Sequence, residues 1–154
     1  MDIHRKCAGV FLINPISNMY FVGRRSDISS VWQIPQGGAD ADESHLECAT
    51  RELREETGVR TIKLLKNTAN LYRYDFPPDI RACFSEHFGI DYKGQELRFF
   101  LFQFLGDESE IDLSSTSSPE FSEWKWMEIN GILDSMIHFK KDAFREAAKE
   151  LQLL

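Results

Sequence analysis

The chain contains 154 residues, of which 42% are hydrophobic and 12% aromatic. This composition excludes an intrinsically disordered chain and suffices for one globular domain, residues 1–154, with a buried core. The formal net charge of −7 argues against a general nucleic-acid coat, because such proteins need a basic surface. A polyanionic ligand would have to be received by metal ions or by a local basic cluster.

The three cysteines, Cys7, Cys48 and Cys83, are widely spaced, which indicates neither a disulfide framework nor a zinc site and favours a reducing compartment. No apolar run approaches the roughly 18 residues of a membrane span. The N-terminal residues MDIHRK lack the apolar core of a signal peptide. We therefore expect a soluble cytoplasmic protein, or an organellar one if a transit segment has been removed.

Residues 8–14 and 19–25 are two β-prone runs separated by a Pro/Asn/Ser turn, and this pattern predicts a hairpin. Residues 31–35 form a short apolar piece that ends in proline, as expected of an edge strand. The Gly37-Gly38 pair would let a ligand approach the backbone closely, although a plain loop could also contain it.

A helix is expected to begin near residues 42–44, where acidic side chains suit the helix dipole. It should end at Gly58, a typical C′ glycine. The apolar residues at helical spacing are Leu46, Ala49, Thr50 and Leu53, and they predict a narrow buried stripe.

Two further strands are expected at residues 61–65 and 69–74, followed by a long, ordered connection over residues 79–94. Residues 97–105 form the strongest strand, and their nearly continuous apolar sequence predicts that both faces are covered. Residues 107–119 have the acidic, serine-rich composition of a surface loop.

The last third of the chain predicts one more strand, over residues 123–128, with Trp124 and Trp126 on the same face. A short helix is expected over residues 129–135. A final helix should run from Phe139 to about Leu151 and bury the stripe Phe144, Ala147, Ala148 and Leu151. The predicted architecture is an α/β fold with a mixed β-sheet and helices on either side.

Three glutamates, Glu52, Glu55 and Glu56, stand three and four residues apart, so a helix would place them on one face. Like charges at this spacing repel one another, and a bound cation would relieve the repulsion. The alternative is a solvated acidic helix face, which is what most charge runs are.

The surrounding residues favour a metal site. Gly37 is followed after five residues by Glu43, after seven more by Arg51-Glu52-Leu53, and then by Glu55-Glu56 and Gly58-Val59. This spacing matches every position of the Nudix box, and nine specified positions within 23 residues make a specific signal. The stretch therefore resembles the Nudix hydrolase family.

Carboxylate oxygens suit hard divalent ions such as Mg²⁺ or Mn²⁺, which can bridge an acidic helix to a pyrophosphate. Glu52, Glu55 and Glu56 are the expected ligands, and one of them, or a nearby glutamate, is expected to act as general base. Glu43 and Arg51, two turns apart on the helix, are interpreted as a structural pair that orients the loop, with a plain surface pair as the alternative.

The resemblance extends from about Arg5 to the final helix and points to one Nudix branch. That branch holds the bacterial RNA pyrophosphohydrolases and the bacterial and plant asymmetric dinucleoside tetraphosphate hydrolases. The stretches that carry it are residues 32–38, 74–78, 93–95 and 119–121, with Trp124, Trp126 and Phe139-Lys140. It implies the α/β/α Nudix sandwich and attack of water on a phosphoanhydride with Mg²⁺ or Mn²⁺ bound.

The family's pattern also implies roles for single residues. Glu120 matches an acidic residue outside the helix that reaches the metals or serves as a base, and Gly37 matches a metal-site position. The expected substrate-binding residues are Arg5, Arg25, Gln36, Gly38, Lys93, Arg98 and Lys140, together with Tyr74 and Phe139, which would stack on a nucleobase. For the basic residues a surface role is the alternative, and for the two aromatic residues core packing.

Two departures from the branch affect the expected substrate. Leu71 stands where the branch usually has tryptophan, and residues 96–100 read Glu-Leu-Arg-Phe-Phe where Lys-Trp-Phe is usual. Arg98 keeps the charge, but arginine and lysine are not interchangeable at a phosphate. Both changes lie outside the catalytic helix, so they concern substrate choice rather than the reaction.

The first hypothesis is therefore a Mg²⁺-dependent pyrophosphohydrolase that removes pyrophosphate from 5′-triphosphate RNA and also cleaves dinucleoside polyphosphates. A dedicated diadenosine tetraphosphate hydrolase is the close alternative, and a catalytically idle binder of nucleotides or RNA ends is the remote one. We expect no double-stranded DNA or membrane partner, and a monomer or small homo-oligomer.

Overall fold

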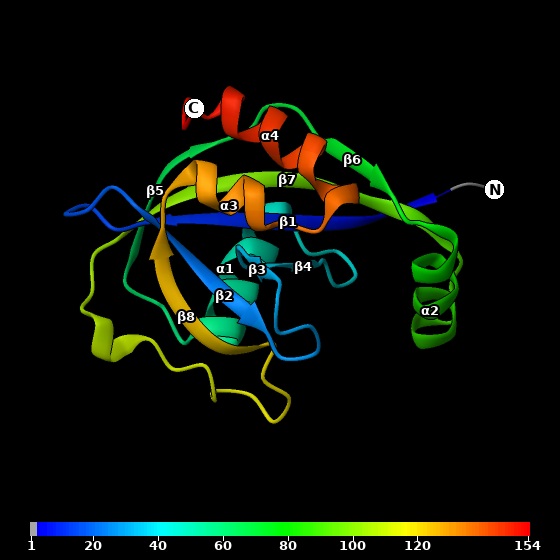
Figure 1. Ribbon diagram of the computed structural model, residues 1–154, viewed down its shortest axis with the longest axis horizontal. Helices are drawn as coiled ribbons and strands as arrows, with labels where there is room; N and C mark the ends of the chain where they lie inside the picture. Colours follow the sequence, from blue (N-terminus) through cyan, green and yellow to red (C-terminus); the bar gives the residue numbers. More distant parts are fainter. Residues whose placement is uncertain (1–2) are drawn as a thin grey trace.

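The computed structural model describes residues 3–154, and its centre is one mixed β-sheet (Figure 1). The strands of this described part are β1 (Ile3–Ile13), β2 (Tyr20–Arg25), β3 (Trp32–Gln33), β4 (Gln36–Gly38), β5 (Ile62–Asn67), β6 (Tyr72–Asp75), β7 (Tyr92–Phe104) and β8 (Phe121–Met127). Five of them follow the order β3-β2-β1-β7-β5, while β4 pairs with β1, β6 with β7 and β8 with β2. The β1–β7 pair is parallel and the other pairs are antiparallel, which confirms the mixed sheet.

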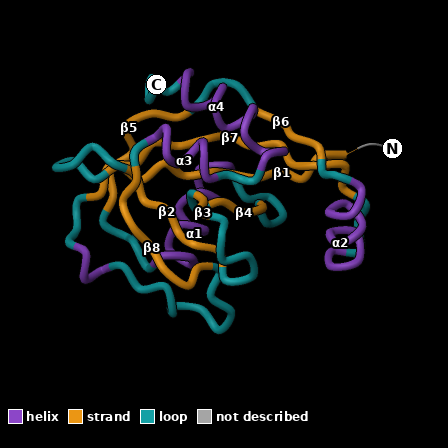
Figure 2. The backbone as a smooth tube through the Cα atoms, in the orientation of Figure 1, coloured by secondary structure: helices purple, strands orange, loops and turns teal. Residues whose placement is uncertain are grey.

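Helices cover both faces of this sheet (Figure 2). On one face lies α1 (His45–Thr57), and on the other lie α3 (Ile129–Ser135) and α4 (Lys141–Glu150). The remaining helix, α2 (Pro78–Phe88), connects the end of β6 to the start of β7 and projects from that edge of the sheet. The α/β/α sandwich expected from the sequence is confirmed.

Strand β7 shows why two core layers form. Its odd-numbered residues Leu97, Phe99 and Leu101 pack on the side of α3 and α4, whereas Phe100 and Phe102 pack on the side of α1. Because successive side chains of a strand point to opposite faces, an apolar run fills both layers. The prediction of a strand covered on both faces is confirmed, although the strand begins at Tyr92 rather than near Leu97.

The predicted hairpin is present, with Ile13 opposite Tyr20 and Asn18 at a φ of 59° in the turn. The predicted edge strand is β3, which pairs only with β2 at the end of the strand order. The final helix buries Phe144, Ala147 and Ala148 as expected. It begins at Lys141, after a 3₁₀ turn over His138–Lys140, rather than at Phe139.

The connection over residues 79–94 is the largest difference between the sequence analysis and the structure. Residues 78–88 form α2 instead of an irregular connection. The Pro77-Pro78 pair suggests a break, but proline at the first helical position is compatible with a helix, because that position needs no intrahelical N–H bond. Gly89, at a φ of 70°, ends the helix.

Helix α1 begins one residue after the expected start, because Ser44 caps it. The Ser44 hydroxyl accepts a hydrogen bond from the backbone N–H of Glu47, and the Glu47 carboxylate accepts one from the backbone of Ser44. Gly58 closes the helix with a φ of 76°, as predicted. The predicted stripe is partly wrong, because Leu46 is 41% exposed, and the buried hydrophobic residues of α1 are Cys48, Ala49 and Leu53.

None of the helices between residues 3 and 154 is both long and apolar enough to cross a membrane.

Candidate active site

A cleft with a volume of about 530 Å³ opens between α1, β4, α2 and the segment before α4. Its lining brings together residues from distant parts of the chain: Arg5, Arg25, Gln33, Gln36, Gly37, Gly38, Glu52, Glu55, Glu56, Tyr74, Phe76, Gln95, Glu120, Phe139, Lys140 and the inner face of α2. The three glutamates of α1 thus lie in a cleft rather than on a solvated surface.

Arg51 holds the acidic side of the cleft together. Its guanidinium donates to both carboxylate oxygens of Glu43, at 2.8 and 2.9 Å. The same group donates to Glu52 at 3.0 Å, to Glu55 at 3.1 Å and to the carbonyl oxygen of Gly38 at 2.9 Å. The predicted pairing of Glu43 with Arg51 is present, but Glu43 precedes the helix, so the pair ties the loop to α1.

The hydrogen bonds from Arg51 are the largest cause that lowers the pKa of Glu43, to about 2. Glu43 therefore stays ionised and pairs with Arg51 over the whole working range of pH.

Gly37 is required where it stands because the Glu52 carboxylate occupies the space beside its Cα. A Cβ at position 37 would lie 2.0 Å from Cδ of Glu52 and 2.3 Å from its Oε1. Those atoms belong to the end of a flexible side chain, so a larger residue would displace the carboxylate rather than the backbone.

We therefore expect Gly37→Ala to lower kcat by about 10²-fold or more, since a small misplacement of a reacting group has this effect. The melting temperature should change by only a few degrees. Both quantities can be measured on the purified variant, with Gly106→Ala as a control for a glycine outside the cleft. A Gly37→Ala protein with wild-type kcat would contradict the close packing of Glu52 on this residue.

Glu56 is the most constrained carboxylate in the cleft. It is 8% exposed, and its Oε2 is buried without a hydrogen-bond partner. Burial raises the pKa of Glu56 well above its ordinary value, and repulsion from Glu52 and Glu120 raises it further. A hydrogen bond from the backbone of Gln36 acts in the opposite direction. Between residues 3 and 154, the ionised form of Glu56 has no ion-pair partner within 4 Å, although its charge raises the pKa of Lys140.

Glu52 shows a similar effect, since burial raises its pKa from 4.5 to about 7 despite the opposing charge of Arg51. The folded pKa lies above the unfolded one, so protonation of Glu52 favours folding. This contribution is fully present below about pH 4.5 and is lost as the pH rises through about 7.

In EDTA, the melting temperature of the wild-type chain is thus expected to fall by several degrees between about pH 4.5 and pH 8. The Glu52→Gln variant should show a smaller fall, because its amide does not titrate. Melting curves of both proteins across this range test the assignment, and parallel pH profiles would contradict it.

Glu120 reaches the cleft from the loop before β8, and its charge is felt by both Glu56 and Lys140. Arg25 lines the cleft from the end of β2 and is fixed by Asp27, with bonds of 2.8 and 2.6 Å. Lys140 is 8% exposed, and burial beside the charge of Arg25 lowers its pKa to about 8. Three of the predicted charged residues, Glu120, Arg25 and Lys140, thus converge here.

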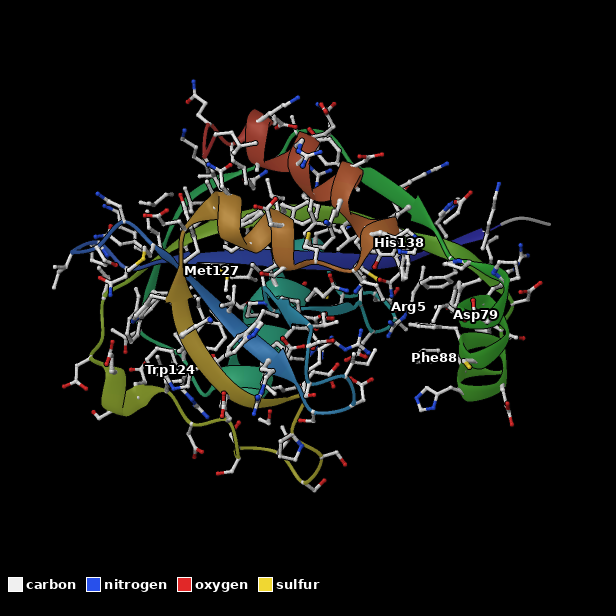
Figure 3. All side chains as sticks on the ribbon, in the orientation of Figure 1. Arg5, Asp79, Phe88, Trp124, Met127 and His138 are labelled. Atoms are coloured by element: carbon white, nitrogen blue, oxygen red, sulfur yellow. The ribbon has the colours of Figure 1, made fainter. Side chains whose placement is uncertain are left out.

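Arg5 and Gly38 meet on the β1–β4 side of the cleft. The Arg5 guanidinium fills the space that a side chain at Gly38 would need, at 2.3 Å from the missing Cβ. On its other side, Arg5 lies over the ring of Phe88 of α2, at 4.3 Å from the ring centroid. Figure 3 shows the two side chains pointing toward each other.

Tyr74 and Phe139 both line the cleft, but in different ways. Tyr74 is only 5% exposed, and its ring packs against Phe139 at 5.7 Å and Phe144 at 6.3 Å. Its hydroxyl donates to Gln95 and accepts from Gln36. A base could not lie flat on this ring, so the structure favours core packing for Tyr74. Phe139 is only partly buried and remains available for stacking.

Lys93 and Arg98 are not brought to the cleft. Lys93 lies 3.6 Å from Asp75 at the outer end of β7. Arg98 donates to the carbonyl oxygens of Thr68, at 2.7 Å, and Ala69, at 3.2 Å. Along β7, residue 98 points to the face opposite Gln95, which does line the cleft.

The sequence analysis missed several lining residues. The inner face of α2 supplies Ile80, Cys83, Phe84, His87 and Phe88. Their spacing in the sequence was a usable helical signal, but the two prolines obscured it. Gln33, with a buried, unpartnered amide oxygen, also faces the cleft. The loop expected over residues 107–119 contributes Thr116 and Ser118.

A NUDIX domain matches residues 3–148 of the chain. The chain belongs to the Nudix family. As a Nudix hydrolase it is an enzyme that acts on phosphoanhydride bonds, and such hydrolases generally use a divalent metal.

Two relatives match this Nudix hydrolase over nearly its whole length. Nudix hydrolase 26, chloroplastic, of Arabidopsis thaliana is 40% identical over 145 residues, which cover 93% of this chain and 67% of the relative. An RNA pyrophosphohydrolase of Wolbachia sp. subsp. Drosophila simulans (strain wRi) is 37% identical over 150 residues, which cover 97% of this chain and 90% of the relative.

Solved structures share the Nudix fold at low sequence identity. The dihydroneopterin triphosphate pyrophosphohydrolase of E. coli has a TM-score of 0.73 at 13% identity, with 94% of this chain and 97% of that chain covered. The Ap4A hydrolase binary complex of C. elegans has a TM-score of 0.64 at 16% identity, with 96% and 99% covered. These likenesses show the fold that the sequence predicts.

The residues of the cleft fit a divalent cation. Between residues 3 and 154, no three acidic, histidine or cysteine side chains already converge to hold an ion, and Arg51 binds the oxygens of Glu52 and Glu55. The unpartnered Oε2 of Glu56, repelled by Glu52 and Glu120, is what a hard cation would complement.

Proposed function

We propose that this Nudix hydrolase uses Mg²⁺, or Mn²⁺ in its place, to remove pyrophosphate from 5′-triphosphate RNA ends and to cleave dinucleoside polyphosphates. The observation that carries the proposal is the buried, unpartnered carboxylate oxygen of Glu56 in a cleft that also holds three basic side chains. The acidic residues of the cleft can thus bind a metal ion, and its basic residues can bind phosphate.

In this proposal the cation would be held by Glu52, Glu55, Glu56 and Glu120, and Gly37, which the sequence assigns to the metal site, lines the same cleft. When bound, the metal would neutralise charge on the phosphates and lower the pKa of a coordinated water. Arg51 keeps Glu52 and Glu55 on the cleft side of α1. Glu56, whose pKa is raised by burial and by the charges of Glu52 and Glu120, is one candidate for the general base, and Glu120 is the second.

The basic residues receive the phosphates. Arg25, whose guanidinium is fixed by Asp27, and the buried ammonium of Lys140 both line the cleft, close enough for the charge of Arg25 to lower the pKa of Lys140. Arg5 lies against Gly38 and completes the set. These positions account for a chain with a net charge of −7 that binds a polyanion without a basic surface.

The choice of RNA ends as first substrate is supported by relatives named RNA pyrophosphohydrolase, among them one of Bartonella tribocorum at 38% identity over 160 residues. Relatives named chloroplastic leave an organellar location open beside the expected cytoplasmic one. We also propose a monomer or small homo-oligomer without a double-stranded DNA partner, as the sequence predicts.

The proposal is tested by measuring kcat/KM for a 5′-triphosphate RNA oligonucleotide and for diadenosine tetraphosphate, each in Mg²⁺, in Mn²⁺ and in EDTA. We expect pyrophosphate release from the RNA, dependence on the metal, and loss of both activities in Glu55→Gln but not in the control Glu146→Gln. Intact turnover in Glu55→Gln would contradict the metal site. A kcat/KM far higher for the dinucleotide would make dinucleoside polyphosphates the principal substrate.

A further inference from the structure

The inner face of α2, which is mostly apolar, lines the cleft, and two of its residues, Ile80 and Phe84, also pack against the edge of the hydrophobic core. Its members are spaced at i, i+3, i+4, i+7 and i+8, and every one of them lines the cleft: Ile80, Cys83, Phe84, His87 and Phe88. None of the residues of α2 is buried, and Phe88 is 39% exposed. Such a stripe in a surface helix normally packs against the core. Here it forms the outer wall of the active site.

The aromatic rings of this wall form a continuous series. Phe76 and Phe84 stack with ring centroids 4.3 Å apart and an interplanar angle of 27°. Phe84 and Phe88 follow at 5.4 Å and 32°. At the inner end, Phe76 meets Phe139 edge-on at 6.4 Å. The series therefore runs from the buried Phe76 to the exposed Phe88, with successive rings inclined by 27° and 32°.

Arg5 connects this wall to the phosphate-binding side of the cleft. Its guanidinium lies 4.3 Å from the centroid of the Phe88 ring and against the backbone of Gly38 (Figure 3). Gly38 directly follows Gly37, whose missing side chain makes room for the Glu52 carboxylate. A ligand that touches both Arg5 and Phe88 therefore also lies near the glutamates.

We propose that Phe84 and Phe88 form a nucleobase-binding wall, which stacks against a base of the nucleotide whose phosphates lie at the glutamates. The inference rests on the proposed function and names its substrate class: polyphosphates that carry a base, rather than base-free polyphosphates. Base–aromatic stacking tolerates any base, so the wall suits both an RNA end and a dinucleoside polyphosphate.

The chemistry of the cleft favours a nucleobase over other occupants. An apolar peptide or a second copy of the chain would cover the rings, but neither would use the adjoining basic residues Arg5, Arg25 and Lys140. A nucleotide matches both halves, because its base is planar and its phosphates are anionic. Tyr74 is 5% exposed, whereas Phe88 of α2 is 39% exposed, so Phe88 offers the larger accessible ring surface.

The test uses two ligands in Ca²⁺ buffer: diadenosine tetraphosphate, and inorganic tetraphosphate as the base-free probe. Titration calorimetry on the double variant Phe84→Leu/Phe88→Leu should show a Kd for the dinucleotide that is at least about tenfold higher. The loss of base–aromatic stacking for one base changes affinity by about this factor or more. The Kd for tetraphosphate should stay within about twofold. Phe88→Trp should retain the wild-type Kd for the dinucleotide, and the control Ile90→Ala, just beyond α2, should behave as wild type.

Equal weakening for both ligands, or no weakening for either, would overturn the proposal. Light scattering on the same samples tests whether a second copy of the chain covers α2 instead. If the double variant is a monomer where the wild type is a dimer, and both Kd values are unchanged, α2 is a contact between copies and the proposal is wrong. Melting curves establish that the variant is folded. Failure of the wild-type enzyme to release pyrophosphate from RNA or to cleave dinucleotides would instead overturn the proposed function.

Discussion

The Glu56→Gln protein is expected to lose about 10²–10⁴-fold in kcat, the range associated with a group that moves a proton in the transition state. The amide keeps the shape of the side chain but removes the charge that would bind metal or accept a proton. In EDTA the variant should melt at or above the wild-type temperature, because the amide removes the cost of burying a carboxyl group with an unpartnered oxygen and two repelling neighbours.

The measurement combines steady-state kinetics in Mg²⁺ with melting curves in EDTA and in Mg²⁺. Wild type should be stabilised by the metal, whereas Glu56→Gln should gain less from it. Glu146→Gln, an exposed acid on α4, is the matched control and should resemble wild type in every respect. A Glu56→Gln enzyme with both full activity and full stabilisation by Mg²⁺ would show that Glu56 has no part in the metal site.

The second large effect is expected from Arg51→Met. The guanidinium bonds to Glu43, Glu52 and Glu55, and its side chain is only 18% exposed. Removal of one partner from a buried ion pair costs about 3–5 kcal/mol, because the remaining charges are left without compensation. Exposure of Glu55 reduces this figure, so we expect about 3 kcal/mol, or a fall in melting temperature of roughly 6–12 °C.

Added Mg²⁺ should restore part of that loss, since it can neutralise the carboxylates that Arg51 leaves behind. Thermal melts of Arg51→Met with and without the metal measure both effects. Arg54→Met serves as the control, because Arg54 is an exposed arginine of the same helix and should cost less than about 1 kcal/mol. Similar losses in the two variants would show that the network around Arg51 contributes little to stability.

Local features of the sequence predicted the catalytic helix well. The start near residues 42–44, the end at Gly58 and the common face of Glu52, Glu55 and Glu56 all depend on contacts within a few residues. Such contacts are set by helical periodicity and by capping, which neighbouring residues carry in their own sequence. The nearly continuous apolar sequence of residues 97–105 predicted in the same way that both faces of the sheet are covered.

Contacts between distant residues could not be read from the same patterns. Arg98 lies three residues after Gln95 in β7, so the two side chains point to opposite faces of the sheet. Gln95 lines the cleft, and Arg98 points away from it. Tyr74 was expected to stack on a base, but the rings of Phe139 and Phe144 enclose it. Helix α2 was missed because two prolines at its start resemble a break, although a helix accepts proline there.

The sequence by itself determined the reaction, because the spacing of the Nudix box fixes which carboxylates share a helix face. The tertiary structure alone decided how these carboxylates are buried, positioned and paired. Glu56 is buried without a partner, Gly37 makes room for Glu52, and Arg51 ties the loop to the helix. It also placed the inner face of α2 opposite these groups. The physical reason is that burial and charge compensation depend on everything packed around a group, whereas helical periodicity depends on its neighbours along the chain.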